Sequence, residues 1–84
     1  MHFLKLPKDT NLENQEEKFL EEVNEFLEAT KKNEIGDEFF DVVQAGLSLM
    51  QIKGIGKKDI RNAKIRHQDK MLKRKWGLGE YINL

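Results

Sequence analysis

The sequence predicts an all-α fold, with three main helices per chain that assemble into an oligomeric helical bundle. Apolar residues recur at spacings of three and four, which is the period of an amphipathic helix. Strong helix breakers are few: Pro7 is the only proline, and the first closely spaced glycines are Gly54 and Gly56. Long uninterrupted stretches with this period favour helices over strands.

The first helix is expected over about residues 11–30. The stretch "TNLE" fits a capping box, with Thr10 as the N-cap and the side chain of Glu13 reaching back to it. Its apolar residues recur at helical spacing and form an apolar face, namely Phe19, Leu20, Val23, Phe26 and Leu27.

The second helix is expected over about residues 34–53, after the polar turn "KKN", with Asn33 as its N-cap. This helix is apolar around most of its circumference, because Phe40 and Leu47 fall opposite its main apolar face. Three helices are too few to cover it, so we expect a homodimer or a homotetramer. The phenylalanines expected in the core are Phe19, Phe26, Phe39 and Phe40.

The third helix is expected over about residues 57–75, after the turn "KGIGKKD". The stretch "WGLGEYINL" follows, and its glycines predict an irregular end. We find no repeat and no linker long enough to separate domains. Residues 1–84 are therefore predicted to form one domain, with residues 1–10 as a lead-in and residues 77–84 as a C-terminal tail.

The composition excludes several classes of protein. Charged residues make up 36% of the chain, the formal net charge is zero, and cysteine is absent, so disulfides and thiolate metal sites are excluded. Two histidines are too few for a typical zinc site. No apolar run approaches the roughly 20 residues that cross a bilayer, and "MHFLKLPKDT" is too short and polar for a signal peptide. We expect a cytoplasmic protein without membrane contact.

The zero net charge hides a strong asymmetry along the chain. Residues 9–41 contain twelve acidic and three basic side chains, whereas residues 53–75 contain ten basic and two acidic ones. Two interpretations stay open. The two halves attract each other within a bundle, or the acidic half holds cations while the basic half meets phosphate.

Two pairs of carboxylates lie beside the predicted apolar faces. At about 100° per residue, Glu38 falls inside the apolar arc of the second helix, and Asp41 lies at its border, about 60° away. In the first helix, Glu22 lies at the edge of the apolar face and Glu25 one step outward. If the two helices pack antiparallel, the four carboxylates converge and require a cation. The alternative is a set of surface acids paired with lysines.

Oxygen ligands without histidine or cysteine favour a hard cation, with Mg²⁺ first and Mn²⁺ second. Magnesium retains water and binds substrate phosphates, so such a site indicates chemistry on nucleotide polyphosphates.

This arrangement resembles the MazG-like all-α nucleoside triphosphate pyrophosphohydrolases. Their signature is E-E-x-x-E and, after a spacer, E-x-x-D, each on its own helix. Here "EEVNE" is followed by a twelve-residue spacer and "EFFD". These motifs supply Glu21, Glu22, Glu25, Glu38 and Asp41. A competing register, "EIGD", uses Glu34 and Asp37, but its spacer is short.

The resemblance covers about residues 10–75. It is closest to the short stand-alone members from phages and low-GC bacteria, whose third helix carries stretches like "HQDK" and "RKWG". It implies hydrolysis of a (d)NTP between the α and β phosphates, which gives (d)NMP and pyrophosphate. The base and the sugar are not specified by these motifs.

The resemblance also implies roles for individual residues. One or more Mg²⁺ ions, or Mn²⁺, would polarise the phosphates and help to generate the attacking hydroxide. Either Glu21 or Glu25 would orient or deprotonate the water, and both stay open. Basic residues on one face of the third helix would neutralise the substrate phosphates and the leaving pyrophosphate. The implied metal ligands are Glu22, Glu25, Glu38 and Asp41, and the phosphate-binding residues are Lys64, Lys70 and Arg74.

Two other functions are compatible with the sequence. The stretch "KKDIRNAKIRHQDKMLKRKW" suits a non-catalytic helical interaction module or a nucleic-acid-binding module, whose phosphate binding would depend on salt. The acidic half counts against nucleic acid, because it repels phosphates. The other possibility is a family member that keeps the fold and has lost activity. The residue that suggests it is Asp37, which stands where the family usually has Glu.

Overall fold

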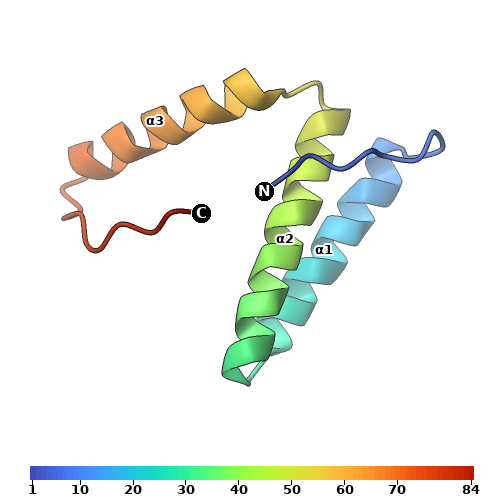
Figure 1. Cartoon of the computed structure of the whole chain (residues 1–84), viewed down its shortest axis with the longest axis horizontal. Helices are drawn as coiled ribbons and strands as arrows, with labels where there is room; N and C mark the ends of the chain where they lie inside the picture. The colour runs from blue at the N-terminus through green and yellow to red at the C-terminus, as the bar shows by residue number, and fades with distance from the viewer. The chain divides into compact units, whose positions relative to one another are not determined.

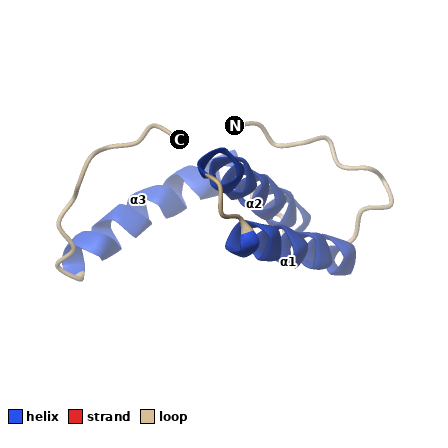
Figure 2. Cartoon of the chain, turned by 90° about the horizontal axis from the view of Figure 1, so that it is seen from below, coloured by secondary structure: helices blue, strands red, loops and turns tan.

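The chain folds into three α-helices in the computed structural model, which describes all 84 residues. Its elements are α1 (Leu12–Glu28), α2 (Lys32–Ile52) and α3 (Lys57–Lys73), and it contains no strand (Figures 1 and 2). The predicted all-α class with three helices is confirmed, whereas oligomeric assembly stays a prediction. None of the three helices combines the length and the apolar character that crossing a membrane requires.

Two compact units make up the chain, Met1–Gly54 and Ile55–Leu84. The first unit contains α1 and α2, which pack side by side and run antiparallel, joined by a short turn (Figure 1). The second unit contains α3 and the C-terminal residues, which form no further helix or strand. The predicted single domain over residues 1–84 stays a prediction.

The start of α1 lies one residue later than the predicted capping box requires. Asn11, not Thr10, is the N-cap, and its side-chain oxygen accepts a hydrogen bond from the backbone N–H of Asn14 at 2.9 Å. Asparagine and threonine are both good caps. Because the two stand next to each other here, the sequence pattern does not separate them.

The start of α2 lies two residues earlier than predicted. Lys31 occupies the N-cap position without a side-chain hydrogen bond, and Asn33 lies inside the first turn, so the prediction of Asn33 as N-cap is wrong. Ala29 and Lys31 are both extended. This geometry lets the chain reverse quickly and leaves no room for the longer turn that the sequence suggested.

The ends of α3 are fixed by local hydrogen bonds. At its start, the backbone N–H of Gly56 donates to the carboxylate of Asp59 at 2.9 Å. At its end, Lys75 adopts a left-handed conformation with φ of 63°, and the N–H of Trp76 donates to the carbonyl of Met71 at 3.0 Å. This pattern is a Schellman motif, which ends the helix two residues before the predicted position.

The buried core is small and partly polar. Its only buried residues are Ala45, Ser48 and Glu22. A close approach of α1 and α2 explains the burial of Ala45, because Gly46 beside it has no side chain and faces the ring of Phe19. The burial of Glu22, a carboxylate, needs a separate explanation.

A cluster of phenylalanine rings extends this core. Phe26 of α1 and Phe39 of α2 are half-buried, with ring centroids 6.1 Å apart, and Phe39 is 5.2 Å from Phe40. Phe19 is also half-buried. Phe40 was predicted to lie in the core, but it is 44% exposed. The helical period places it opposite the main apolar face of α2, which accounts for this exposure.

One glycine inside α2 and one just after it are expected to respond in opposite ways to substitution by alanine. Gly54, just after the helix, has φ of +80°, which disfavours alanine, so Gly54→Ala should lower the free energy of unfolding by about 1 kcal/mol. Gly36 lies inside the helix, and an added methyl group would meet no atom within 4 Å. Gly36→Ala should therefore raise the free energy of unfolding by about 1 kcal/mol. Urea titrations followed by circular dichroism would measure both, and shifts of the same sign would contradict this expectation.

Candidate metal centre

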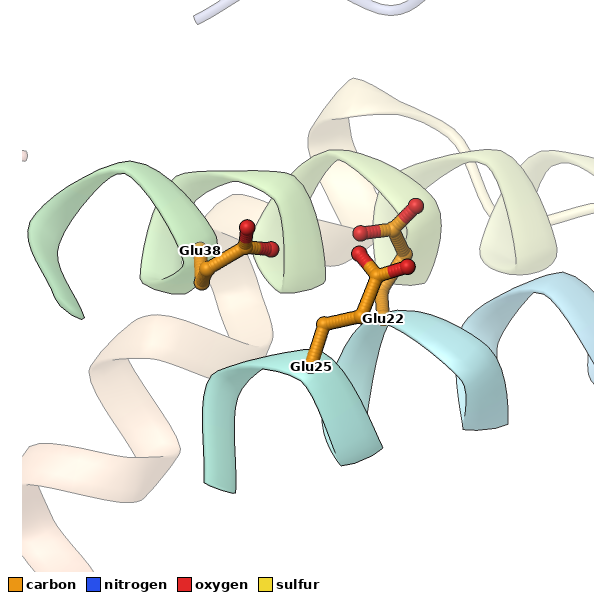
Figure 3. Close-up of side chains that lie close together, drawn as sticks. All are labelled: Glu22, Glu25 and Glu38. Atoms are coloured by element: carbon orange, nitrogen blue, oxygen red, sulfur yellow. The ribbon is translucent and has the colours of Figure 1, made fainter. Parts of the chain in front are cut away.

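Three carboxylates from α1 and α2 meet in the first unit. Glu22 and Glu25 project from α1, and Glu38 projects from α2 toward them (Figure 3). One oxygen of each lies within 4.8 Å of the others. Glu22 and Glu25 share a helix face because they are three residues apart, and the antiparallel packing of α2 brings Glu38 opposite. Three of the four predicted metal ligands are thus gathered together.

Taken together, these three carboxylates are only partly buried, and two of their oxygen atoms lack hydrogen-bond partners. Glu22 is only 7% exposed. One oxygen of Glu22 and one of Glu38, the Oε2 atom in each case, are buried without a hydrogen-bond partner. A buried carboxylate oxygen without a partner is strongly unfavourable. A bound cation would satisfy both atoms, and an all-oxygen ligand set suits Mg²⁺ or Mn²⁺. The residues present therefore fit a hard divalent cation.

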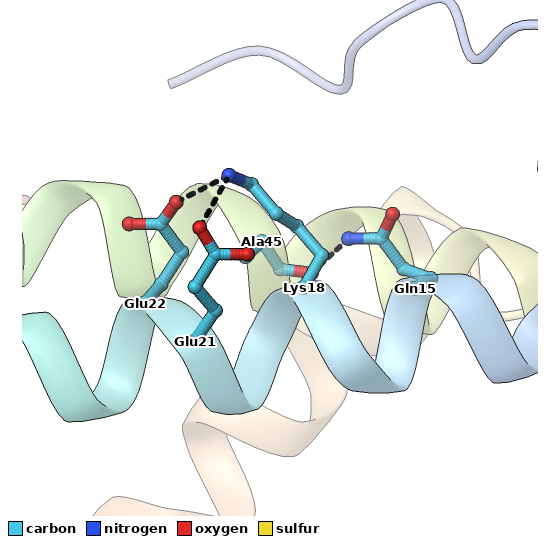
Figure 4. Close-up of polar contacts among 5 residues, drawn as sticks. All are labelled: Gln15, Lys18, Glu21, Glu22 and Ala45. Carbon is cyan, nitrogen blue, oxygen red and sulfur yellow. Dashed lines mark hydrogen bonds and ion pairs between the residues drawn. The ribbon is translucent and has the colours of Figure 1, made fainter.

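A lysine that the sequence analysis did not single out contacts this cluster. The Nζ atom of Lys18 lies 2.8 Å from Glu22 Oε1 and 3.8 Å from Glu21 Oε1 (Figure 4). The hydrogen bond to Glu22 raises the pKa of Lys18, and the same bond lowers the pKa of Glu22. The spacing of four residues between Lys18 and Glu22 was the available sequence signal.

Removing the charge of Lys18 is expected to strengthen cation binding, because its ammonium group competes with the cation for Glu22. The Lys18 side chain is 52% exposed, so solvent weakens the competition. Lys18→Gln should raise the affinity for Mg²⁺ by up to about fivefold. Isothermal titration calorimetry would measure this affinity. The control is Lys53→Gln, because Lys53 is the C-cap residue of α2 and lies outside the carboxylate cluster. A weaker affinity in Lys18→Gln would show that Lys18 supports the cation instead.

The negative charge of Glu22 raises the pKa of Glu25 above its ordinary value of 4.5, and burial and the charge of Glu38 add to this effect. Glu25 therefore binds a proton more readily in the folded chain than in the unfolded chain. Its contribution to stability is present at low pH and is lost as the pH rises through the raised pKa. Glu22 has the opposite sign, because its lowered pKa gives a contribution that is lost as the pH falls.

This proton competes with a cation, so the affinity for Mg²⁺ should fall as the pH is lowered through the raised pKa of Glu25. Mg²⁺ titrations at a series of pH values would show the decline. Glu25→Gln should bind Mg²⁺ more weakly and should lose this step in the pH profile. A profile that is the same in Glu25→Gln and the wild type would contradict the assignment of the step to Glu25.

The other acidic candidates lie around the cluster. Asp41 is exposed and is not one of the three gathered carboxylates, but it lines a pocket of about 340 Å³ together with Glu22. Glu21 is exposed and lies outside the group. Glu34 and Asp37 are also exposed and outside it. Glu38 lies in the cluster, whereas its partner Asp41 and both residues of the competing pair lie outside it. The choice of register stays a prediction.

The basic candidates belong to the second unit. Lys64 and Lys70 are exposed on α3, and Arg74 is exposed at its C-cap. No residue of α3 is buried. Their contact with the phosphates of a substrate held at the carboxylates stays a prediction.

Comparisons with known proteins add no relative to this description. No protein-family model matches the sequence, and searches of curated proteins and of solved structures gave no match. The resemblance to MazG-like enzymes therefore depends on the quoted motifs, and the function that it implies is a proposal.

Proposed function

We propose that the chain is a Mg²⁺-dependent nucleoside triphosphate pyrophosphohydrolase of the MazG-like type, acting in the cytoplasm. It would cleave a (d)NTP between the α and β phosphates to (d)NMP and pyrophosphate. The observation that carries this proposal is the gathering of Glu22, Glu25 and Glu38, with two buried oxygens that lack partners. The ion pair with Lys18 occupies only Oε1 of Glu22, and a bound cation would give the unpartnered Oε2 atoms of Glu22 and Glu38 a partner.

The proposed roles follow from the position of each carboxylate. Glu22, Glu25 and Glu38 would hold the cation, and Asp41, beside the same pocket as Glu22, would complete the ligand set. When bound, Mg²⁺, or Mn²⁺ in its place, supplies positive charge to the phosphates and activates water. Glu21 lies outside the gathered group. This position favours Glu21 over Glu25 as the residue that orients or deprotonates the water.

The basic residues of α3 would serve the same reaction. Lys64, Lys70 and Arg74 are exposed cations that can neutralise a polyphosphate chain. In the proposed reaction they bind the substrate phosphates and stabilise the negative charge that develops on the leaving pyrophosphate.

The oligomeric state forms part of the proposal. Leu20 and Leu27 on α1 are 60% and 72% exposed, and they share one face because they are seven residues apart. Phe40 on α2 is also largely exposed. Burial of these side chains against other copies would supply the core that one chain lacks, so we propose a homodimer or homotetramer. Size-exclusion chromatography with light scattering would test this, and a monomeric mass would contradict it.

The reaction itself is tested by its products. Phosphorus NMR of a nucleoside triphosphate incubated with the protein and Mg²⁺ should show a nucleoside monophosphate and pyrophosphate appearing together. Formation of a nucleoside diphosphate and orthophosphate instead would place the cleaved bond between the β and γ phosphates and would contradict the proposal.

A second candidate is a non-catalytic interaction or nucleic-acid-binding module. It is favoured by α3, which buries no residue and presents many basic side chains. In that case the double variant Lys70→Ala/Arg74→Ala should weaken binding to an oligonucleotide, and the wild-type affinity should fall steeply with salt. Under the pyrophosphohydrolase proposal, oligonucleotide binding is weak in both proteins, because the acidic half repels phosphate.

A further inference from the structure

One face of α1 carries two exposed leucines that follow two exposed glutamates. Leu20 and Leu27 are 60% and 72% exposed, although both are apolar. Glu13 and Glu16 are also exposed, and they lie seven and four residues before Leu20. At about 100° per residue these four side chains fall within about 60° of one another, so they share one surface, which we call the α1 face.

The third helix carries the same pattern, with basic residues in the place of the acids. Ile65 and Leu72 are 58% and 49% exposed. Lys58 and Arg61 are exposed, and they lie seven and four residues before Ile65. These four side chains also fall within about 60° and form the α3 face. The α3 face therefore repeats the spacing of the α1 face with the opposite charge.

The two faces match when the helices lie parallel and in register. The glutamates of α1 then lie opposite Lys58 and Arg61, and its leucines lie opposite Ile65 and Leu72. Antiparallel packing in register would set charged side chains against apolar ones. Two α1 faces in parallel would set acids against acids, and two α3 faces would set bases against bases, which is unfavourable in both cases. The α1 face thus fits an α3 face better than it fits a copy of itself.

We propose that α3 of a second copy of this chain docks on the α1 face. Within one chain the side chains of both faces are exposed, and docking between copies would bury them. The inference rests on the oligomer proposed above and names its surfaces, but it does not depend on nucleotide hydrolysis. Each copy offers both faces, so two copies can make the contact twice. Lys70 lies about 150° from the centre of the α3 face, so docking leaves this candidate phosphate ligand free.

The test reverses the charges of one face at a time in the whole chain. Glu13→Lys/Glu16→Lys and Lys58→Glu/Arg61→Glu each set like charges opposite one another. Each variant alone should associate at least about tenfold more weakly than the wild type. An equimolar mixture of the two should recover association, because each α1 face then meets an α3 face of opposite charge on the other copy. Sedimentation velocity over a concentration series at low salt would measure the masses and the dissociation constants.

The matched control is Arg66→Glu/Lys73→Glu. Both residues are exposed on α3, about 90° or more from the centre of its face, and this variant changes the net charge by the same amount as Lys58→Glu/Arg61→Glu. Its association should stay within about twofold of the wild type. A chain that combines all four reversals of the two faces should again associate with itself. Circular dichroism would establish that each variant is helical before the masses are compared.

Each outcome supports the docking or overturns it. Recovery in the mixture, with weak association of each component, would establish that the contact joins two copies. Association like that of the wild type in either face variant would overturn the proposal, as would a mixture that associates no better than its components. A monomeric wild type would overturn it together with the oligomer. If the wild type hydrolyses no nucleotide but associates as expected, the proposed enzyme fails while the docking stands.

Discussion

Glu38→Gln is expected to abolish Mg²⁺-dependent pyrophosphate release while leaving the chain folded. Glu38 supplies the only carboxylate of the cluster that comes from α2, and one of its oxygens is buried without a partner. The neutral amide is a poor ligand for Mg²⁺, so the loss of charge stabilisation should reduce the rate by at least about 100-fold. Mg²⁺ should also no longer raise the melting temperature, because binding to the folded state is lost. Pyrophosphate release and thermal unfolding, each with and without Mg²⁺, would measure both effects.

Glu34→Gln is the matched control for this substitution. Glu34 lies one turn earlier on α2 and is exposed outside the cluster, so its amide should leave Mg²⁺ binding and pyrophosphate release within about twofold of the wild type. The pair also decides between the two motif registers. Full loss of activity in Glu34→Gln with an active Glu38→Gln would assign the ligands to "EIGD" and would refute the centre described here.

Phe26→Ala is expected to cause the largest loss of stability among substitutions outside the carboxylates. Its ring packs on Phe39 across the contact of α1 with α2, in a unit that buries very few residues. Truncation of a fully buried phenylalanine removes about 3–5 kcal/mol, and half-burial reduces this to about 2 kcal/mol. A small domain has little stability to spare, so a large unfolded population should appear. Urea unfolding followed by circular dichroism would measure the change.

The control for Phe26→Ala is Tyr81→Ala, in the C-terminal residues. Tyr81 is 77% exposed and lies outside any helix, so its loss should change the free energy of unfolding by less than about 0.5 kcal/mol. If the two substitutions destabilise the protein equally, the rings of α1 and α2 are not its main apolar contact.

Helix periodicity and the scarcity of helix breakers were sufficient to predict the three helices, because neither signal depends on what covers each apolar face. The ends were less predictable. Asn11 rather than Thr10 caps α1, since both residues can accept the same hydrogen bond. The short turn before α2 depends on extended backbone at Ala29 and Lys31. Neither residue type signals that conformation.

The candidate site was predictable in its main features. The helical wheel placed Glu38 inside an apolar arc and Glu22 at the edge of another, and in the structure Glu22 is buried while Glu38 is half-buried. The helical wheel also placed Asp41 at the border of the apolar arc of α2, and Asp41 is exposed in the structure. The ion pair of Lys18 with Glu22 was missed, although its spacing of four residues is a known helix signal.

The pocket beside Glu22 and Asp41 could not be predicted from the sequence. It depends on hydrogen bonds from Gln44 and Gln51 to main-chain carbonyls more than forty residues away. Main-chain carbonyls occur at every residue, so no residue type marks those that these amides select. Residues 1–10 were therefore predicted only as a lead-in.

The measurement that tests the proposed enzyme most directly is pyrophosphate release by the wild-type protein from a panel of NTPs and dNTPs, with and without Mg²⁺. We predict release that requires Mg²⁺, is supported less well by other cations apart from Mn²⁺, and varies with the base. No release from any nucleotide by folded protein in the presence of Mg²⁺ would contradict the proposal. The chain would then be either a binding module or a relative of the MazG-like enzymes that has lost catalysis.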